Sequence, residues 1–560
     1  MLPIFYGTRL MAAFSKAGRR LSMHYISHSV IIILFSFTTL AQTTPAAQPA
    51  VQVFHTSDRC LACHNGLVDT SGTDISIGTN WQSSMMAHSA HDPYWQAGVR
   101  REIMDHAEAR GAIEDKCSSC HMPMARFMAK TAGQEGRVFK HLPIAPALTK
   151  KDILAAEGVS CTMCHQITEE KLGTEESFTA GFVVDTQTPL GQRSVFGPFD
   201  VDAGRTRVML SSAQFVPTMK THIQDSAFCA TCHTLYTHAL GPDGEVVGEL
   251  PEQVPYLEWK HSAYKESRNC QSCHMPVLTK SAAISSVLGL PREGFSQHIF
   301  RGGNFFMPKI FNQNRIELGV EALPSDLNRT VNETVAHLQT KTARLAIQQA
   351  NITEGRLQID VSVKNLAGHK LPTAYPSRRV WLNLTVRDRD GRTVFTSGKL
   401  QQDGSIEGND NDVDPEQYEP HYTLIENRQQ VQIYEAIMIN HQDKVTTGLL
   451  SAVGYIKDNR LLPEGFDKKT AHEDIAVRGA AAEDENFNDK GDLVSYSIAI
   501  SESRSPYSIV VMLWYQPIAF RWAKNLAAYK AAETERFVGF FDQMAQESAV
   551  ILTRDQKTVE

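Results

Sequence analysis

The sequence predicts an α+β multidomain protein. A mostly helical and loop-rich region comes first, and an all-β, sandwich-like region and a C-terminal helix follow. At 560 residues the chain is too long for one hydrophobic core. All ten cysteines lie in the first half, where long periodic runs are scarce, whereas strand patterns begin only after about residue 335. The segments expected from these observations are residues 1–41, 42–52, 53–335, 336–516 and 517–560.

The first segment has the features of a secretory signal peptide. Basic residues precede the apolar run VIIILFSFTTLA, and cleavage is expected after Ala41. The run is too short for a membrane span, which takes about 20 residues, and an uncleaved anchor is the alternative. Export predicts a periplasmic protein, with an outer-membrane-associated or extracellular location as further options. Residues 42–52 have the composition of a flexible linker.

The ten cysteines of residues 53–335 form five C-x-x-C pairs, and a histidine follows each pair directly. These groups are Cys60, Cys63 and His64; Cys117, Cys120 and His121; Cys161, Cys164 and His165; Cys229, Cys232 and His233; and Cys270, Cys273 and His274. C-x-x-C-H is the signature for attachment of c-type haem. The two thiols bind the haem vinyl groups, and the histidine becomes the proximal iron ligand. A zinc site would need histidines at other spacings, and a redox dithiol or a disulfide scaffold needs none. The sequence therefore predicts five covalent haem c groups.

Two of these motifs stand in similar surroundings. CSSCHMP begins at Cys117 and CQSCHMP begins at Cys270, and aromatic, serine-rich stretches precede them at residues 80–95 and 256–264. We expect one haem-packing module to be used twice. The proline after each motif should end the helix that carries the histidine, so that the chain turns away from the ring.

Each haem iron has a second axial position, and histidines outside the motifs are the expected ligands. A histidine there gives a low-potential electron-transfer haem, and a methionine raises the potential. The predicted ligands are His88, His141, His222, His298 and His369. Met85, Met86, His106 and His261 are the reserve candidates. His369 lies beyond the cysteine-rich region and would reach the last haem from the β region.

The β region, residues 336–516, shows alternating apolar residues. The predicted strands are 356–365, 379–398 with a turn at Asp390-Gly391, 430–439, 493–500 and 507–515. Several such strands between turn residues predict a β-sandwich. In residues 517–560, apolar residues recur every three or four positions from about 518 to 548, which predicts a helix with one packed face.

The loop GNDNDVDPE at 408–416 is a weaker candidate metal site. Asp410, Asp412 and Asp414 alternate as Ca²⁺ ligands do, but Pro415 stands where a calcium loop has glycine. A solvated acidic loop is the alternative. The net charge of −7 is mild and shows no polybasic block, so no nucleic-acid partner is expected.

The segments EGVSCTMCHQI and FCATCHTLYTHAL, with NCQSCHMP further on, resemble exported bacterial multihaem c-type cytochromes. The wider group includes the tetrahaem cytochrome of ammonia oxidisers and hydroxylamine oxidoreductase. The stretch NLAGHKLPTAYPSRRVWLNLTVRDRDG resembles the β-sandwich appended to some of them. The resemblance covers about residues 55–515 and implies mostly bis-histidine haems stacked in parallel and perpendicular pairs. The chain departs from related enzymes in two ways. It has five motifs rather than the eight of hydroxylamine oxidoreductase, and it lacks the C-x-x-C-K motif of the catalytic haem in pentahaem nitrite reductases.

The expected function is to transfer electrons between other redox proteins through closely packed haems. The sequence therefore favours an electron carrier over a catalyst. We expect the protein to associate with a membrane only through a redox partner or through an uncleaved signal peptide. The alternative is an oxidoreductase in which one open iron acts on a small nitrogen, sulfur or peroxide species. In that case Arg100 and Arg101, or Arg378 and Arg379, would attract an anionic substrate to the iron. Paired arginines of this kind also bind haem propionates. A third reading gives the function to the β region, as a binder of a polymer or mineral surface.

Overall fold

The computed structural model describes residues 52–144 and 150–560. The predicted signal peptide, and the predicted linker except for its last residue, lie outside this range. The described residues belong to a single compact unit. Within them, no helix combines the length and the apolar character that crossing a bilayer requires.

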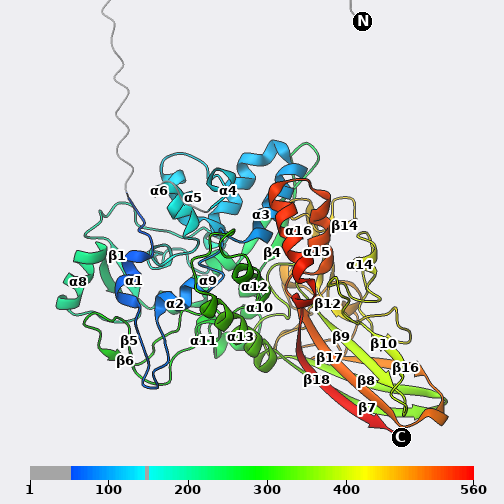
Figure 1. Cartoon of the computed structure of the whole chain (residues 1–560). Coiled ribbons are helices and arrows are strands. Elements are labelled where there is room, and N and C mark those ends of the chain that lie inside the picture. Colours follow the sequence, from blue (N-terminus) through cyan, green and yellow to red (C-terminus); the bar gives the residue numbers. More distant parts are fainter. Residues whose placement is uncertain (1–51, 145–149) are drawn as a thin grey trace, which may run out of the picture. The chain divides into compact units, whose positions relative to one another are not determined.

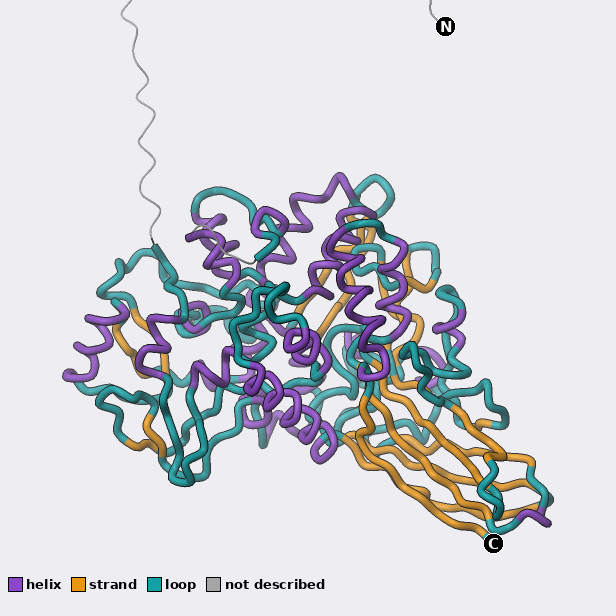
Figure 2. The backbone as a smooth tube through the Cα atoms, viewed as in Figure 1, coloured by secondary structure: helices purple, strands orange, loops and turns teal. Residues whose placement is uncertain are grey.

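The N-terminal region consists of short helices joined by loops (Figure 1, Figure 2). Its helices are α1 (Asp58–His64), α2 (Ile77–Gln82), α3 (Pro93–Asp105), α4 (Arg110–His121), α5 (Pro123–Thr131), α6 (Lys150–Ala156), α7 (Cys161–Cys164), α8 (Ala203–Ala213), α9 (Ser226–His233), α10 (Pro255–Lys260), α11 (Cys270–His274), α12 (Phe306–Gln313) and α13 (Pro324–Lys341). Prolines begin several of them, at a position where no backbone N–H is needed. At α3 the carboxylate of Asp92 also accepts from the N–H groups of Tyr94 and Trp95.

Three strand pairs interrupt this helical region. They are β1 (Ser194–Gly197) with β2 (Val216–Met219), β3 (Leu235–Leu240) with β4 (Val246–Gln253), and β5 (Ala282–Ala283) with β6 (Pro291–Arg292). The first pair is parallel and the other two are antiparallel. The sequence patterns did not predict any of them. Four of these strands have four residues or fewer, and the longer β4 contains Gly248 and Pro251, which are unfavourable inside a strand.

The β region contains two larger sheets. One has the order β10-β9-β17-β18, with β12 paired to β9, and the other has the order β11-β16-β8-β7. Their strands are β7 (Ala343–Thr353), β8 (Arg356–Asn365), β9 (Arg379–Arg387), β10 (Thr393–Ser397), β11 (Leu424–Ile425), β12 (Ile433–Tyr434), β16 (Asp492–Ala499), β17 (Tyr507–Gln516) and β18 (Val550–Val559). A smaller sheet is formed by β13 (Ala436–Asn440), β14 (Val445–Thr446) and β15 (Ala452–Asp458). Burial alternates strictly along β8, as its apolar pattern predicts.

The predicted α+β fold class is confirmed, and the C-terminal segment adds a strand to it. After α15 (Phe520–Asn525) and α16 (Ala532–Met544), the chain returns to the β region as β18 and pairs with β17 along most of its length. Of these two helices, α16 packs on α3, and Arg100 of α3 makes two hydrogen bonds to Glu533 of α16 at 2.8 and 3.1 Å. Figure 1 shows α16 beside α3.

One hydrophobic core runs through both regions. Phe305, Phe306 and Leu327 from the helices share it with Val361 and Leu382 from the strands. The boundary predicted between residues 335 and 336 falls inside α13. This shared core places the loop after β8 directly against the cysteine-rich region.

Candidate haem-binding centre

The five C-x-x-C-H motifs lie on five short helices, which define five sites. Site 1 is on α1, site 2 on α4, site 3 on α7, site 4 on α9 and site 5 on α11. The cysteines of each motif are three residues apart, so a helix brings both thiols to one face. The helices end at the histidine, or one residue before it in α7. At site 2 the helix stops at His121, and Pro123 begins the next helix.

Four motif histidines donate Nδ1–H to a backbone carbonyl. The acceptors are Ile284 O for His64 (2.6 Å), Ser89 O for His121 (2.9 Å), Phe196 O for His165 (2.6 Å) and Arg301 O for His274. This bond fixes the tautomer and leaves Nε2 as a lone-pair donor, which is how metal-binding histidines are normally held. For His233, no such bond is formed within the described residues.

Two motif histidines face a second histidine. The ring centres of His165 and His298 lie 6.2 Å apart, and those of His274 and His369 also lie 6.2 Å apart, with interplanar angles of 18° and 13°. Two imidazoles that share one metal, at roughly 2 Å for each bond, have ring centres about 6 Å apart. His298 and His369 also place Nδ1 near a backbone oxygen, at 3.1 and 2.9 Å. These pairs therefore fit the two axial positions of a haem iron.

The histidines of these sites are held in the neutral form. Desolvation, and then the neighbouring His165, lowers the pKa of His298 to about 3. Desolvation likewise lowers the pKa of His121 to about 4. A neutral imidazole is the form that binds a metal, so no proton has to be displaced at neutral pH.

The other three predicted ligands do not face a motif histidine in the structure. The ring of His88 contacts His91 and Phe311, and both of its nitrogens are buried without a partner. His222 directs Nε2 at Ile167 O (2.8 Å) and packs against phenylalanine rings. His141 is 2.8 Å from a carboxylate oxygen of Asp152.

The reserve candidates have other partners. Nε2 of His106 lies 3.2 Å from Ser451 Oγ, and Nε2 of His261 lies 3.0 Å from Asp467 O. Met85 packs against the main core. One contact of a motif histidine could not be predicted from the sequence. The indole of Trp95 stacks on His121, with ring centres 4.4 Å apart and planes 4° from parallel.

Most of the arginines considered as helpers form structural contacts. Arg100 pairs with Glu533, Arg101 with Asp105, and the buried Arg379 with Asp412. Arg378 differs, because it donates to Thr373 O (3.0 Å) and has no acidic partner within the described part of the chain. It lies within electrostatic range of His233 and His369, where an anionic group of a bound haem would find it.

Thiols of different motifs lie next to one another. Cys60 contacts Cys161, Cys120 contacts Cys232, and Cys229 contacts Cys270. Cys164 lies within electrostatic range of Cys229 and Cys232. The histidines repeat this pattern, since His165 is close to His64 and His233 is close to both His121 and His274. Site 1 therefore adjoins site 3, site 3 adjoins site 4, and site 4 adjoins sites 2 and 5. All ten thiols are free of disulfides.

The acidic loop at 408–416, the weak candidate for calcium, contains an ion pair. Arg379 donates to both carboxylate oxygens of Asp412, at 2.8 and 2.9 Å, and the N–H of Ile406 adds a third bond at 2.7 Å. Asp412 is nearly fully buried by these contacts. The middle carboxylate of the loop is therefore already paired within the protein, and this arrangement favours the solvated acidic loop over a calcium site.

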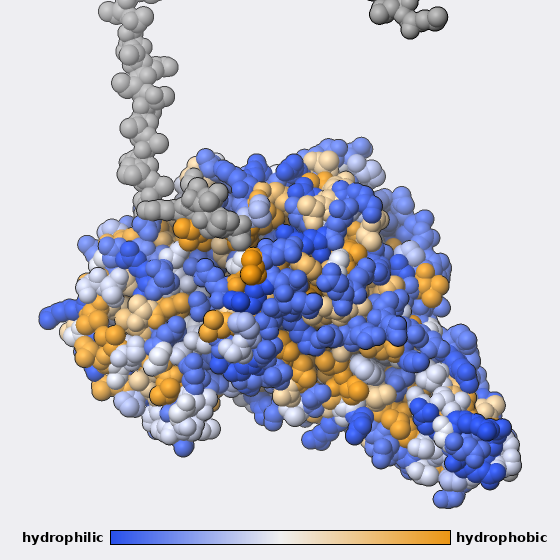
Figure 3. All heavy atoms as spheres, in the orientation of Figure 1, coloured by the Kyte–Doolittle hydropathy of each residue, from blue (hydrophilic) through white to orange (hydrophobic). Residues whose placement is uncertain are grey.

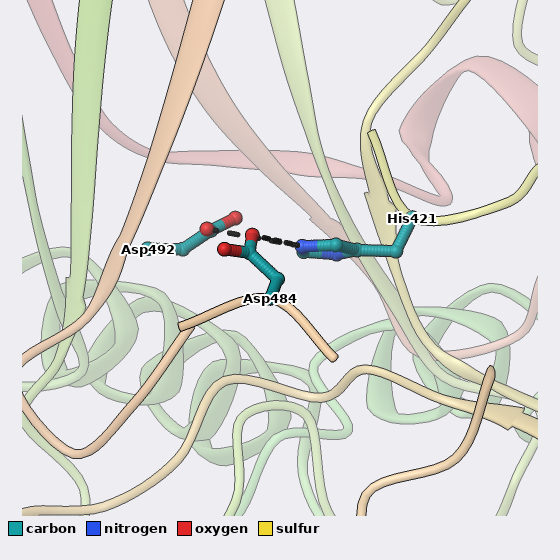
Figure 4. Close-up of side chains that lie close together, drawn as sticks. All are labelled: His421, Asp484 and Asp492. Carbon is teal, nitrogen blue, oxygen red and sulfur yellow. Dashed lines mark hydrogen bonds and ion pairs between the residues drawn. The ribbon is translucent and has the colours of Figure 1, made fainter. Parts of the chain in front are cut away.

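A second acidic cluster lies in the β region. Figure 4 shows the ring of His421 directed at Asp484 and Asp492. Nε2 of His421 is 3.1 Å from Asp484 Oδ2 and 3.9 Å from Asp492 Oδ1. Three such groups in this arrangement are possible metal ligands.

The hydrogen bonds around His421 argue against a metal there. The side-chain amides of Gln432 and Asn459 both donate to Nδ1, at 2.8 and 3.1 Å. The amide of Gln432 cannot be turned round, because its oxygen accepts from the N–H of Tyr422 (2.8 Å). Nδ1 must then be the bare nitrogen, and Nε2 carries the proton that it donates to Asp484. A metal would need that nitrogen deprotonated.

The comparisons with known proteins show the fold. No protein-family model matches the chain, and no curated protein matches it. Among solved structures, the chain is similar to a penta-haem cytochrome c552 from Thermochromatium tepidum, with a TM-score of 0.53 and 15% identity. The alignment covers 90% of this chain and 98% of that chain. The likeness therefore extends over the cysteine-rich region and the β region together.

Proposed function

We propose that this chain is an exported multihaem c-type cytochrome that binds five haem groups and transfers electrons between redox proteins. Haem at each motif would supply one-electron chemistry. The observation that carries the proposal is the contact between thiols of different motifs. Because each thiol pair marks the edge of one bound ring, these contacts hold neighbouring rings side by side. The similarity to a penta-haem cytochrome supports the same assignment.

The contacts define the order of the proposed relay. Sites 1, 3 and 4 form a line, and sites 2 and 5 both branch from site 4. His298 and His369 are the proposed second ligands at sites 3 and 5, which makes both bis-histidine and low in potential. A periplasmic location and soluble or membrane-bound redox partners belong to this proposal, because c-type haems are attached to exported chains.

One observation favours the second candidate function, the oxidation or reduction of a small nitrogen, sulfur or peroxide species. Among the described residues, His64, His121 and His233 are not stacked on a second imidazole, and of these three only His233 has Arg378, which lacks an acidic partner, within electrostatic range. An open iron beside a guanidinium would attract a small anion. The distinction depends on the coordination number at site 4.

The test is a count of haems and of their spin states. The chain would be produced in a host that matures c-type cytochromes, and the haem-to-protein ratio measured by pyridine haemochrome. We expect five haems per chain, and four in the double variant Cys229→Ser, Cys232→Ser. A lower ratio in the unmodified chain contradicts the proposal. Electron paramagnetic resonance of the same sample separates the two functions: five low-spin haems support the carrier, and one high-spin haem lost in the double variant supports the enzyme.

A further inference from the structure

A pocket opens beside His64 at site 1. α1 forms one wall, α8 forms the second and residues 284–292 form the third. Since Nδ1 of His64 is used by Ile284 O, Nε2 is the nitrogen left for a metal. Figure 3 shows apolar side chains gathered on the face of the molecule around α8 and the β5–β6 pair. The pocket is thus a mainly apolar chamber at one end of the proposed relay.

The walls of this pocket are tied together by hydrogen bonds. Arg59 of α1 donates to Ser212 O of α8 (3.3 Å), and Arg205 of α8 donates to Leu288 O of the third wall (2.6 Å). The carboxylate of Asp202 caps the start of α8 and accepts from the N–H of Gly204 (2.9 Å). The side chains of α8 are therefore held in place against site 1.

Apart from His64 and the motif cysteines, Met209 is the one described residue lining this pocket whose side chain is of a type that binds haem iron. The described residues that line it otherwise carry aliphatic, hydroxyl or guanidinium groups, apart from His64 and the two motif cysteines. Met209 lies on α8, partly buried against Val195, Ala213 and Phe215. Methionine is often a core filler, but the cluster behind Met209 is small and its side chain reaches the pocket. A thioether is a known axial ligand of c-type haem.

We propose that Met209 is the second axial ligand of the haem at site 1, opposite His64. This inference rests on the proposed function, because it needs a haem attached to Cys60 and Cys63. Histidine–methionine ligation raises the reduction potential above that of the bis-histidine sites 3 and 5. Site 1 is then the high-potential end of the relay, where electrons leave the chain.

The positive charges around the pocket would also raise the reduction potential at site 1. Arg59 and Arg292 line it, and neither has a carboxylate within ion-pair distance among the described residues. Arg292 instead lies over the ring of Phe199, with its guanidinium carbon 5.4 Å from the ring centre. Unneutralised positive charge disfavours the oxidised, more positive state of a nearby iron and so raises its potential.

The experiment measures the far-red absorption of the ferric five-haem protein. Ferric haem with a methionine ligand shows a band there, and haem with two histidine ligands does not. We expect the unmodified protein to show this band at the intensity of one haem in five. Met209→Leu should abolish it and convert one haem to high spin. Met209→His should abolish it but keep all haems low-spin, and should lower one of the five midpoint potentials.

The matched control is Met219→Leu, a methionine on β2 of the same subregion whose side chain is largely exposed. It should leave the band unchanged. Absence of the band in the unmodified protein overturns the inference, even if no variant can be produced, and so does its survival in Met209→Leu. The haem count separates the two proposals, because five haems without the band refute only the role of Met209, whereas fewer than five refute the proposed function.

Discussion

The surroundings of His298 suit its proposed role as the second iron ligand at site 3. Its ring is parallel to that of His165, it is held neutral by desolvation, and Nδ1 lies beside a backbone oxygen. We predict that His298→Ala leaves the iron at site 3 without its second ligand. One haem should change from low to high spin in the paramagnetic resonance spectrum. His238→Ala is the control, since that side chain is exposed beside Glu249. Identical spectra for the two variants would contradict the assignment.

Glu252 is a buried acid beside the thiols of site 2. Desolvation raises its pKa from 4.5 to about 7, although Thr237 donates to the carboxylate at 2.6 Å. The unfolded chain therefore releases this proton at a lower pH than the folded protein does. The free energy of unfolding should fall as pH rises from about 4.5 to 7, by about 3 kcal/mol from this group.

Glu252→Gln should remove that contribution. The amide oxygen can still accept from Thr237, and no charge is left to bury. We predict that the guanidinium midpoint falls less between pH 5 and pH 8 in the variant than in the unmodified protein. Equal pH dependence in the two proteins would mean that Glu252 stays charged, or stays protonated, throughout this range.

At the scale of elements, the loop after β8 is fixed by the helix before site 5. Glu258 of α10 accepts from Lys370 N (3.1 Å) and from Arg460 (2.8 Å). Lys370 in turn donates to Asp458 (2.7 Å). Burial alone would raise the pKa of Asp458, but Arg460 and Lys370 outweigh it and hold the pKa at about 2. His369 is the neighbour of Lys370, so this buried network positions His369, the proposed second ligand at site 5.

We predict that Glu258→Gln loosens His369 as well as the fold. Removing one charge from a buried network leaves its partners unpaired and costs about 3 kcal/mol. The melting temperature should fall, and part of the haem at site 5 should become high-spin. Glu266→Gln, on an exposed turn of the same segment, should change neither. Loss of stability without a spectral change would show that the network does not act on His369.

Whole strands were missed where the local pattern is weak. β8 was predicted within its observed bounds, because its buried and exposed residues alternate. The second half of β18 is polar, with Arg554, Gln556 and Thr558 exposed, so no apolar alternation marks it in the sequence. Its pairing with β17 at the edge of the sheet makes it a strand. The single helix predicted at the C-terminus is two helices in the structure. The chain bends between them, and α16 packs on α3.

At the scale of the molecule, the helical and β regions share one core. A protein built from separate domains would unfold in steps, whereas one with a common core should unfold together. We predict that far-ultraviolet circular dichroism, which follows the strands and helices, and Soret absorption, which follows the haems, give coincident thermal transitions. A circular dichroism transition at a lower temperature than the Soret transition would show that part of the secondary structure unfolds separately from the haem-binding region.

The sequence by itself determined the local chemistry: ten cysteines in five C-x-x-C-H motifs, each on its own turn of helix, and strands with strict alternation. These features depend on residues a few positions apart, and so they can be read along the chain. The spacing of His64 or His274 says nothing of which side chain lies opposite.

Only the tertiary structure decided the partners. It brings His298 to His165 and His369 to His274 across more than ninety residues, sets the order of the five sites through contacts between distant thiols, and places Met209 in the pocket of site 1. It also directs His88, His141 and His222 to other contacts. The physical reason is that an axial position is filled by whatever side chain the packed core brings there, and the packing of that core is not a local property of the sequence.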